Sequence, residues 1–132
     1  MRLLEEIGEY LASQLSWLHP QENFWYGDVV PDGVETTTVS IFEYPGKQPM
    51  RTFGNPRAVW IYPRIQVLTR DRQYEKSNDA SWEIFHVLDG VVEQAIPKYH
   101  KISGISNPYE LGPDDAGRVR MICNYEVERD YP

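Results

Sequence analysis

The first apolar positions of the chain recur at steps of three and four residues. This spacing predicts an amphipathic helix with one buried stripe, and the acidic residues Glu5 and Glu6 suit the positive end of its dipole. His19-Pro20 ends the helix, because the residue before a proline is pushed out of the helical region. The stripe consists of Leu3, Leu4, Ile7, Leu11, Leu15 and Leu18.

Three runs rich in aromatic and β-branched residues follow, at residues 23–30, 36–44 and 59–69, and they predict three strands. Pro63 lies inside the third run, where it cannot donate a ladder hydrogen bond, so it predicts either a bulge or an edge strand. Residues 45–57 join the last two strands and carry three prolines and two glycines, which predicts a long loop. Arg51 and Phe53 are its candidate anchors, one for a carboxylate and one for an apolar pocket; a surface loop without contacts is the alternative.

A second helix is predicted over residues 72–94, with Asp71 as N-cap and Pro97 beyond its end. Two more strands follow at 98–109 and 118–129, separated by turn residues at 112–117. The last strand alternates: one face carries polar residues with Ile122 as an exception, and we expect the other face to pack against the second helix. The predicted core face consists of Val119, Met121, Cys123, Tyr125 and Val127, and the second helix's buried face of Tyr74, Ser77 or Asn78, Ser81, Ile84, Phe85, Leu88, Val91 and Val92.

These elements predict an α+β fold in the order α-β-β-β-α-β-β, with a mostly antiparallel sheet and two helices packed on one face. The 132 residues suit a single domain, residues 1–132. We expect no membrane span, since no apolar run approaches about 20 residues. An acid by position 5 argues against a signal peptide, and a lone Cys123 cannot form an intrachain disulfide.

The net charge and the aromatic content of the chain limit the classes of function that we expect for it. Thirteen basic and 20 acidic residues give a net charge of −7, opposite to that of a general nucleic-acid binder. Four Trp, nine Tyr and four Phe are a heavy aromatic load for a small domain. Surface rings are common at protein interfaces, but tyrosines also fill half-buried strand positions, and composition leaves both interpretations open.

Residues capable of catalysis are sparse and scattered. His19, His86 and His100 show no metal-ligand spacing, and Asp114-Asp115 has the composition of a solvated turn. Cys123 lies on the apolar face of the last strand. We therefore expect no enzyme activity, no metal and no cofactor; a small enzyme built around His86, Cys123 or Asp114 is the alternative.

Several short motifs in this order resemble a known family. They are Phe42-Glu43-Tyr44-Pro45-Gly46, Arg51-Thr52-Phe53-Gly54, Tyr62-Pro63-Arg64-Ile65-Gln66-Val67, Leu88-Asp89-Gly90, Pro108-Tyr109-Glu110-Leu111-Gly112 and Cys123-Asn124-Tyr125-Glu126-Val127. Together with the leucine-rich opening helix, they resemble the tail terminator proteins of long-tailed bacteriophages, also called tail completion or minor capsid proteins. The resemblance covers nearly the whole chain.

The resemblance implies a structural virion protein that is not an enzyme. It implies a ring, commonly a hexamer, that caps the tail tube, stops its polymerisation and offers a joining surface to the head connector. The implied partners are further copies of the chain, the major tail tube protein, the connector or stopper protein and the tape measure protein. DNA would pass through the lumen without sequence-specific binding. Such a protein is assembled in the bacterial cytoplasm and resides in the neck. Another neck protein, or a non-viral binding module with an aromatic surface, is the alternative.

A closed ring needs two different contact surfaces on each subunit. We expect one surface around an edge strand marked by Pro63 and the other around the basic face of the last strand, whose Arg120 would meet acidic residues of the next subunit. An alternative interpretation places Trp60 and Tyr62 under a helix as ordinary core. The candidate contact residues are Arg51, Phe53, Trp60, Tyr62, Arg64, Arg118, Arg120, Glu5, Glu6 and Glu9.

Overall fold

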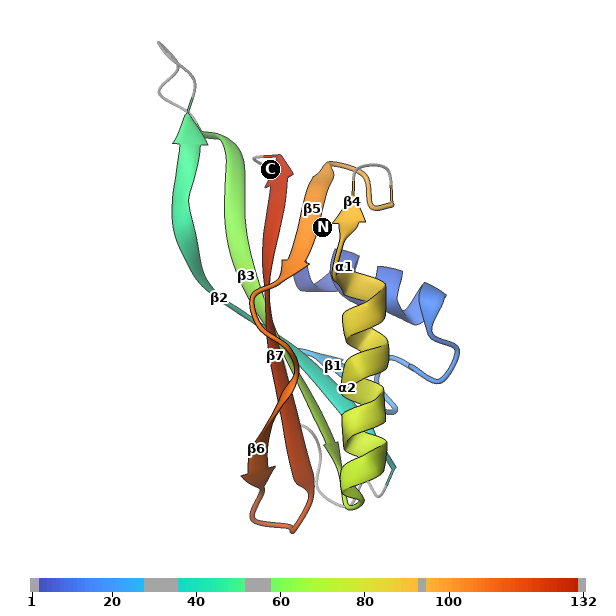
Figure 1. Ribbon diagram of the computed structural model, residues 1–132. Helices are drawn as coiled ribbons and strands as arrows, with labels where there is room; N and C mark the ends of the chain where they lie inside the picture. Colours follow the sequence, from blue (N-terminus) through green and yellow to red (C-terminus); the bar gives the residue numbers. More distant parts are fainter. Residues whose placement is uncertain (1–2, 28–35, 52–57, 93–94, 131–132) are drawn as a thin grey trace.

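The structure is a computed structural model that describes residues 3–27, 36–51, 58–92 and 95–130 (Figure 1). One seven-stranded sheet has the order β1-β2-β3-β7-β5-β4, and β6 pairs with β7 beside β5. Strand β1 is parallel to β2, and the other pairs are antiparallel. The elements are α1 (Leu3–Gln14), β1 (Phe24–Tyr26), β2 (Thr38–Arg51), β3 (Ala58–Asp71), α2 (Tyr74–Leu88), β4 (Val91–Val92), β5 (Tyr99–Gly104), β6 (Tyr109–Pro113) and β7 (Val119–Asp130).

Both helices lie on the same side of the sheet, with α2 running along its length (Figure 1). The predicted α+β class, element order and two-layer packing are confirmed, and the sheet gains the short strands β4 and β6. The strand predicted at 98–109 is only β5, which ends at Gly104; β6 begins at Tyr109 and extends into the turn predicted at 112–117. Of the strand predicted at 23–30, only β1 is observed, and residues 28–30 lie outside the described ranges.

The opening helix is confirmed, but it ends at Gln14 rather than at His19-Pro20. Leu3, Ile7 and Leu11 are buried on its inner stripe. The turns that follow are held by Asn23, whose side-chain amide donates to the carbonyl of Trp17 and whose amide oxygen accepts from the His19 N–H, each at 2.7 Å. The stripe therefore continues into a non-helical segment.

The prediction of a loop over 45–57 is wrong for the part that the structure describes. Strand β2 continues to Arg51 and pairs with β3 up to Ala58, so a long β-hairpin projects from the sheet; residues 52–57 lie outside the described ranges. We call residues 43–51 and 58–64 the arm. Prolines are tolerated here because β1 pairs with β2 only as far as Ile41, and an edge strand loses no ladder bond at a proline.

Pro63 does not mark an edge strand, because β3 lies between β2 and β7. The alternative, a bulge, is correct: the β2–β3 register shifts between Tyr44 and Lys47, beside Pro63. Gly46 fills this bulge, where a Cβ would overlap the carbonyl oxygen of Tyr62. The sequence motif Pro45-Gly46 therefore produces a close backbone approach within the arm, not a loop.

The second helix is shorter than predicted. It ends at Leu88 because Gly90 follows with φ +83°, which only glycine adopts readily, and Val91 and Val92 form β4 instead. Asp71 is not the N-cap, a position that Gln73 occupies; one Asp71 carboxylate oxygen accepts from the Gln73 N–H at 2.8 Å. Ser77, Ala80, Ser81, Ile84 and Leu88 are buried, whereas Tyr74 is exposed.

The alternation of the last strand is confirmed. Met121, Cys123, Tyr125 and Val127 are buried on the face covered by the helices, and Val119 is half-buried. Ile122, the predicted exception, is buried on the opposite face, which no described helix covers. We call this opposite side of the sheet the open face.

Candidate assembly interface

Three cross-strand pairs place the arm's large side chains on the open face. Tyr44 is opposite Arg64, Lys47 is opposite Tyr62, and Met50 is opposite Trp60. Residues directly opposite each other share one face of a sheet. All three β3 side chains are half-buried, so the alternative that Trp60 and Tyr62 form core under a helix is wrong.

Contacts within the arm order these side chains. The Lys47 ammonium lies 4.3 Å from the centroid of the Tyr62 ring, and the Tyr62 hydroxyl is 3.8 Å from the Met50 sulfur. Lys47 and Arg64 both pair with Glu126 of β7, at 3.3 and 3.4 Å. Lys47, Arg51 and Arg64 outnumber the carboxylates of Glu43 and Glu126 by one, so the described arm keeps a small net positive charge. Phe53, the other predicted anchor, lies outside the described residues.

A stacked group fixes the outer part of the described arm. The Trp60 and His100 rings lie 4.4 Å apart, and His100 Nε2 is 2.6 Å from a carboxylate oxygen of Asp130. Trp60 is also opposite Asp130 in the β3–β7 register. The indole is thereby held in a defined orientation while part of it stays accessible to a partner.

The basic residues predicted for a second surface lie at the far end of β7. Arg118 does not offer an exposed contact: its side chain is 10% exposed, and its Nε donates to Asp114 at 3.1 Å. Arg120 is half-buried, and its guanidinium donates to the carbonyls of Gly112 and Pro113. Arg120 nevertheless shares the open face with Arg64, so the two surfaces predicted separately lie on one side of the sheet.

Asp114 organises this turn. Its carboxylate accepts from the backbone N–H groups of Ala116 and Arg118, each at 2.9 Å. Burial opposes its ionisation, but these hydrogen bonds and the Arg118 charge together hold the pKa of Asp114 below its ordinary value. The pKa of the nearby Arg70 is lowered, first by burial and then by the positive charge of Arg118. The turn is thus a self-contained cluster of arginines around one carboxylate.

The predicted acidic residues lie on the other side of the sheet, on α1. Glu6 pairs with Arg129 of β7 at 3.4 Å, and Arg129 Nη1 also donates to the Tyr99 hydroxyl at 3.3 Å. Burial, followed by the charges of Glu9 and Glu5, raises the pKa of Tyr26 beside the helix. Among the described residues, the acidic α1 and the basic arm therefore occupy opposite sides of one sheet.

A cavity of about 350 Å³ adjoins these acidic residues. It lies between α1 and the segment 95–97 that leads into β5, and Glu9 at its wall is exposed. Its lining combines two carboxylates, a phenol, a hydroxyl and apolar groups: Glu6, Glu9, Tyr10, Ser13, Ala95, Ile96 and Pro97. We call it the α1 cavity; nothing in the sequence pattern predicted it.

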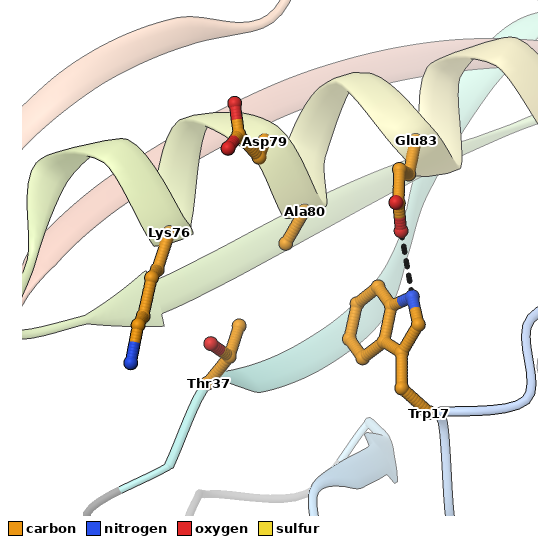
Figure 2. Close-up of a pocket in the computed structure, with 6 residues that line it drawn as sticks. All are labelled: Trp17, Thr37, Lys76, Asp79, Ala80 and Glu83. Carbon is orange, nitrogen blue, oxygen red and sulfur yellow. Dashed lines mark hydrogen bonds between the residues drawn. The ribbon is translucent and has the colours of Figure 1, made fainter.

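A second hollow, of about 210 Å³, lies under α2 and is shown in Figure 2. Lys76, Ala80 and Glu83 reach down from the helix toward Thr37 and Trp17, while Asp79 points away. The Trp17 indole N–H donates to Glu83 at 2.7 Å, which ties the turn after α1 to α2. None of the predicted contact residues lines this hollow.

The residues of the alternative enzyme hypothesis have structural partners. Burial raises the pKa of the Cys123 thiol, which donates to the carbonyl of Ser106, so the thiolate is disfavoured. His86 is exposed on α2 beside the ring of Trp82, and Asp114 holds its own turn. Over the described ranges, no group of three or more His, Cys, Asp or Glu side chains is arranged to hold a metal ion, and no helix is long and apolar enough to cross a membrane.

The arrangement resembles an assembly subunit more than a reaction centre, with an ordered aromatic arm on one side of a sheet and an acidic helix on the other. Comparison with curated protein sequences finds no match to the chain. A family model does match, over residues 4–131, and it is that of the bacteriophage tail terminator protein; the chain belongs to this family and has a structural role in the phage tail.

Proposed function

We propose that the protein is a ring-forming tail terminator, a hexamer that caps the tail tube, stops its polymerisation and joins it to the head connector. Membership of the family supports this proposal, and it suggests a virion protein of the tail that is not an enzyme. Its partners would be other copies of the chain, the major tail tube protein, the connector or stopper protein and the tape measure protein. DNA would pass through the lumen without sequence-specific binding, and the net charge of −7 disfavours adhesion of the protein to the DNA phosphates.

The observation that carries the proposal is the separation of charge across the sheet. A head-to-tail ring needs two different, complementary surfaces on every subunit. The open face carries Lys47, Arg64 and Arg120 with aromatic side chains between them, together with the β7 acids Glu126, Glu128 and Asp130. On the opposite side, α1 carries Glu5, Glu6 and Glu9 and no basic residue over its described range. A subunit whose two sides attract each other fits a ring better than a symmetric dimer.

The available area is sufficient. A standard interface takes roughly 800 Å² from each partner. Two such interfaces would cover about a fifth of the 7560 Å² of accessible surface, which leaves the two ends of the long strands for the tail tube and the connector.

Mass measurement and electron microscopy of the protein with and without purified tail tube protein test this function. We expect a six-fold ring at tube ends and an arrest of tube growth when the protein is added. A subunit that stays monomeric in the presence of tubes and leaves their length unchanged would overturn the proposal. Binding to a head-closure ring instead of the tube would favour the alternative of another neck protein.

A further inference from the structure

The α1 cavity is built to take a cationic side chain. Glu9 is exposed at its wall, and Glu6 offers Arg129 one carboxylate oxygen, which leaves the second oxygen for another donor. Tyr10 contributes a ring, against which a guanidinium packs well. Ile96 and Pro97 supply apolar contacts for an aliphatic stem.

The cavity lies level with the arm along the sheet. Glu6 is joined to Arg129, and Arg129 is opposite Ile61 of β3, one residue from Trp60 in the outer part of the arm. Arg120 is nine residues farther along β7, roughly 30 Å away at about 3.3 Å per residue. Within one subunit, the acidic cavity and the basic arm are therefore at the same height but on opposite sides.

Rotation about a ring axis keeps every part of a subunit at a constant height. If the long strands run nearly parallel to the ring axis, the open face of one subunit meets the helix side of its neighbour. Residues at the same height along the axis then face each other. The neighbour's arm is then the basic element that reaches the α1 cavity. Arg51 is exposed at the last described position of β2, and no described carboxylate forms an ion pair with it.

The edge of the arm is unsuited to the main alternative, in which a strand of the partner adds to the sheet. Pro45 and Pro49 lack N–H groups, Gly46 bulges the strand and Lys47 adds an exposed charge. These features discourage edge-to-edge pairing. The arm is thus equipped to dock through its side chains.

We propose that, in the ring, Arg51 of one subunit inserts between Glu6 and Glu9 in the α1 cavity of the next. The occupant is a second copy of this chain, and charge complementarity at equal height identifies it. This inference rests on the proposed ring, and it names the two elements that close each contact. A guanidinium can engage two carboxylates through its planar fork of donors.

Charge reversal tests the contact. We expect Arg51→Glu and Glu9→Arg each to lower the amount of ring by at least about tenfold, and the double variant to restore it. Lys76→Glu changes the net charge as Arg51→Glu does, at the hollow under α2 and away from the arm and the α1 cavity; it is the matched control and should assemble normally. Thermal unfolding of each monomer checks that folding is unchanged, and Glu6 is left intact because it also pairs with Arg129.

The outcomes separate this contact from the ring itself. If the wild type never assembles on tail tubes, the proposed function fails. If Arg51→Glu assembles like the wild type, or if the double variant is not rescued, the ring stands and the Arg51 contact is overturned. Loss of the ring in Arg120→Glu but not in Arg51→Glu would assign the acidic partner to Arg120 instead.

A cross-link gives a positive test. Arg51→Cys combined with Glu9→Cys should yield disulfide-linked multimers up to the full ring on a non-reducing gel, whereas Arg51→Cys with Glu110→Cys should not. The native Cys123 can remain, because it is fully buried. Equal cross-linking of both pairs would overturn the assignment.

Discussion

Glu6 and Arg129 form an ion pair at 3.4 Å across 123 residues of sequence, joining the first helix to the last strand. The Arg129 guanidinium also lies over the Tyr99 ring, 4.9 Å from its centroid. The side chain of Arg129 is only 7% exposed and that of Glu6 only 19%, so the pair is shielded from solvent. It fixes α1 on the sheet, and thereby fixes the acidic side of the molecule relative to the arm.

Breaking this pair should destabilise the fold. Removing the Glu6 charge leaves a nearly buried guanidinium without its carboxylate, so Glu6→Gln should cost about 1–3 kcal/mol of unfolding free energy. Arg129→Met should also destabilise, and the double variant should lose less than the two single losses added together. Urea unfolding of the four proteins measures this coupling, and strictly additive losses would show that the pair contributes nothing.

The second prediction concerns which face of β7 is buried. Val127 is fully buried opposite Ile102, so Val127→Asp places an unpaired charge in the core and should cost more than about 4 kcal/mol, enough to unfold the domain. Glu128→Asp, which puts the same residue one position along on the open face, is the matched control and should fold normally. Circular dichroism and thermal melts distinguish the two, and a cooperatively folded Val127→Asp of unchanged stability would mean that the strand faces are reversed.

Periodicity was sufficient to predict α1 and β7 because each has one buried face and one exposed face. The alternation from Val119 to Val127 and the leucine steps of α1 both follow directly from burial. Prediction from the sequence pattern was wrong where one residue type is compatible with two different backbone structures. Gly90 lies within the helix predicted over 72–94, although its positive φ ends α2; Pro45 and Pro49 lie within the loop predicted over 45–57, although an edge strand tolerates them.

The candidate interface was only partly predictable. Aromatic content and the alternation around Pro63 picked out Trp60, Tyr62 and Arg64, but their partners Lys47, Met50 and Glu126 come from other strands. The charge of Arg118 favours a contact with a partner, and only the turn geometry shows that Asp114 already engages it. The α1 cavity depends on how the segment 95–97 packs on α1, which no local pattern encodes.

Asp114 should make stability depend on pH in acid. Its pKa is lowered in the folded protein, so its contribution is complete above the unfolded value near 4 and is lost as the pH falls through the folded value. Asp114→Asn should cost about 1–3 kcal/mol at pH 7, through weakened hydrogen bonds to Ala116 and Arg118. This difference should shrink below pH 4 in urea titrations, whereas Asp115→Asn, at the exposed neighbouring position, should change little; a constant difference would contradict the role of the charge.

Shortening the arm should separate assembly from folding. The core is formed by the helices and the rest of the sheet, and β3 keeps its pairing with β7 from Arg64 to Asp71 when the arm is shortened. Tyr44 lies opposite Arg64 in the β2–β3 register, so replacing residues 45–63 by a two-residue turn closes a shorter hairpin; it should lower the free energy of unfolding by no more than about 1–3 kcal/mol, mainly from lost hairpin contacts. The same variant should fail to form rings or to cap tubes, because it removes Lys47, Met50 and Arg51 together.

A matched variant with Lys47, Gln48 and Arg51 all changed to Ser keeps the hairpin and tests the side chains alone. Infectious particles with tails of normal length from the shortened variant would exclude the arm from assembly, whereas an unfolded product would show that the hairpin belongs to the core.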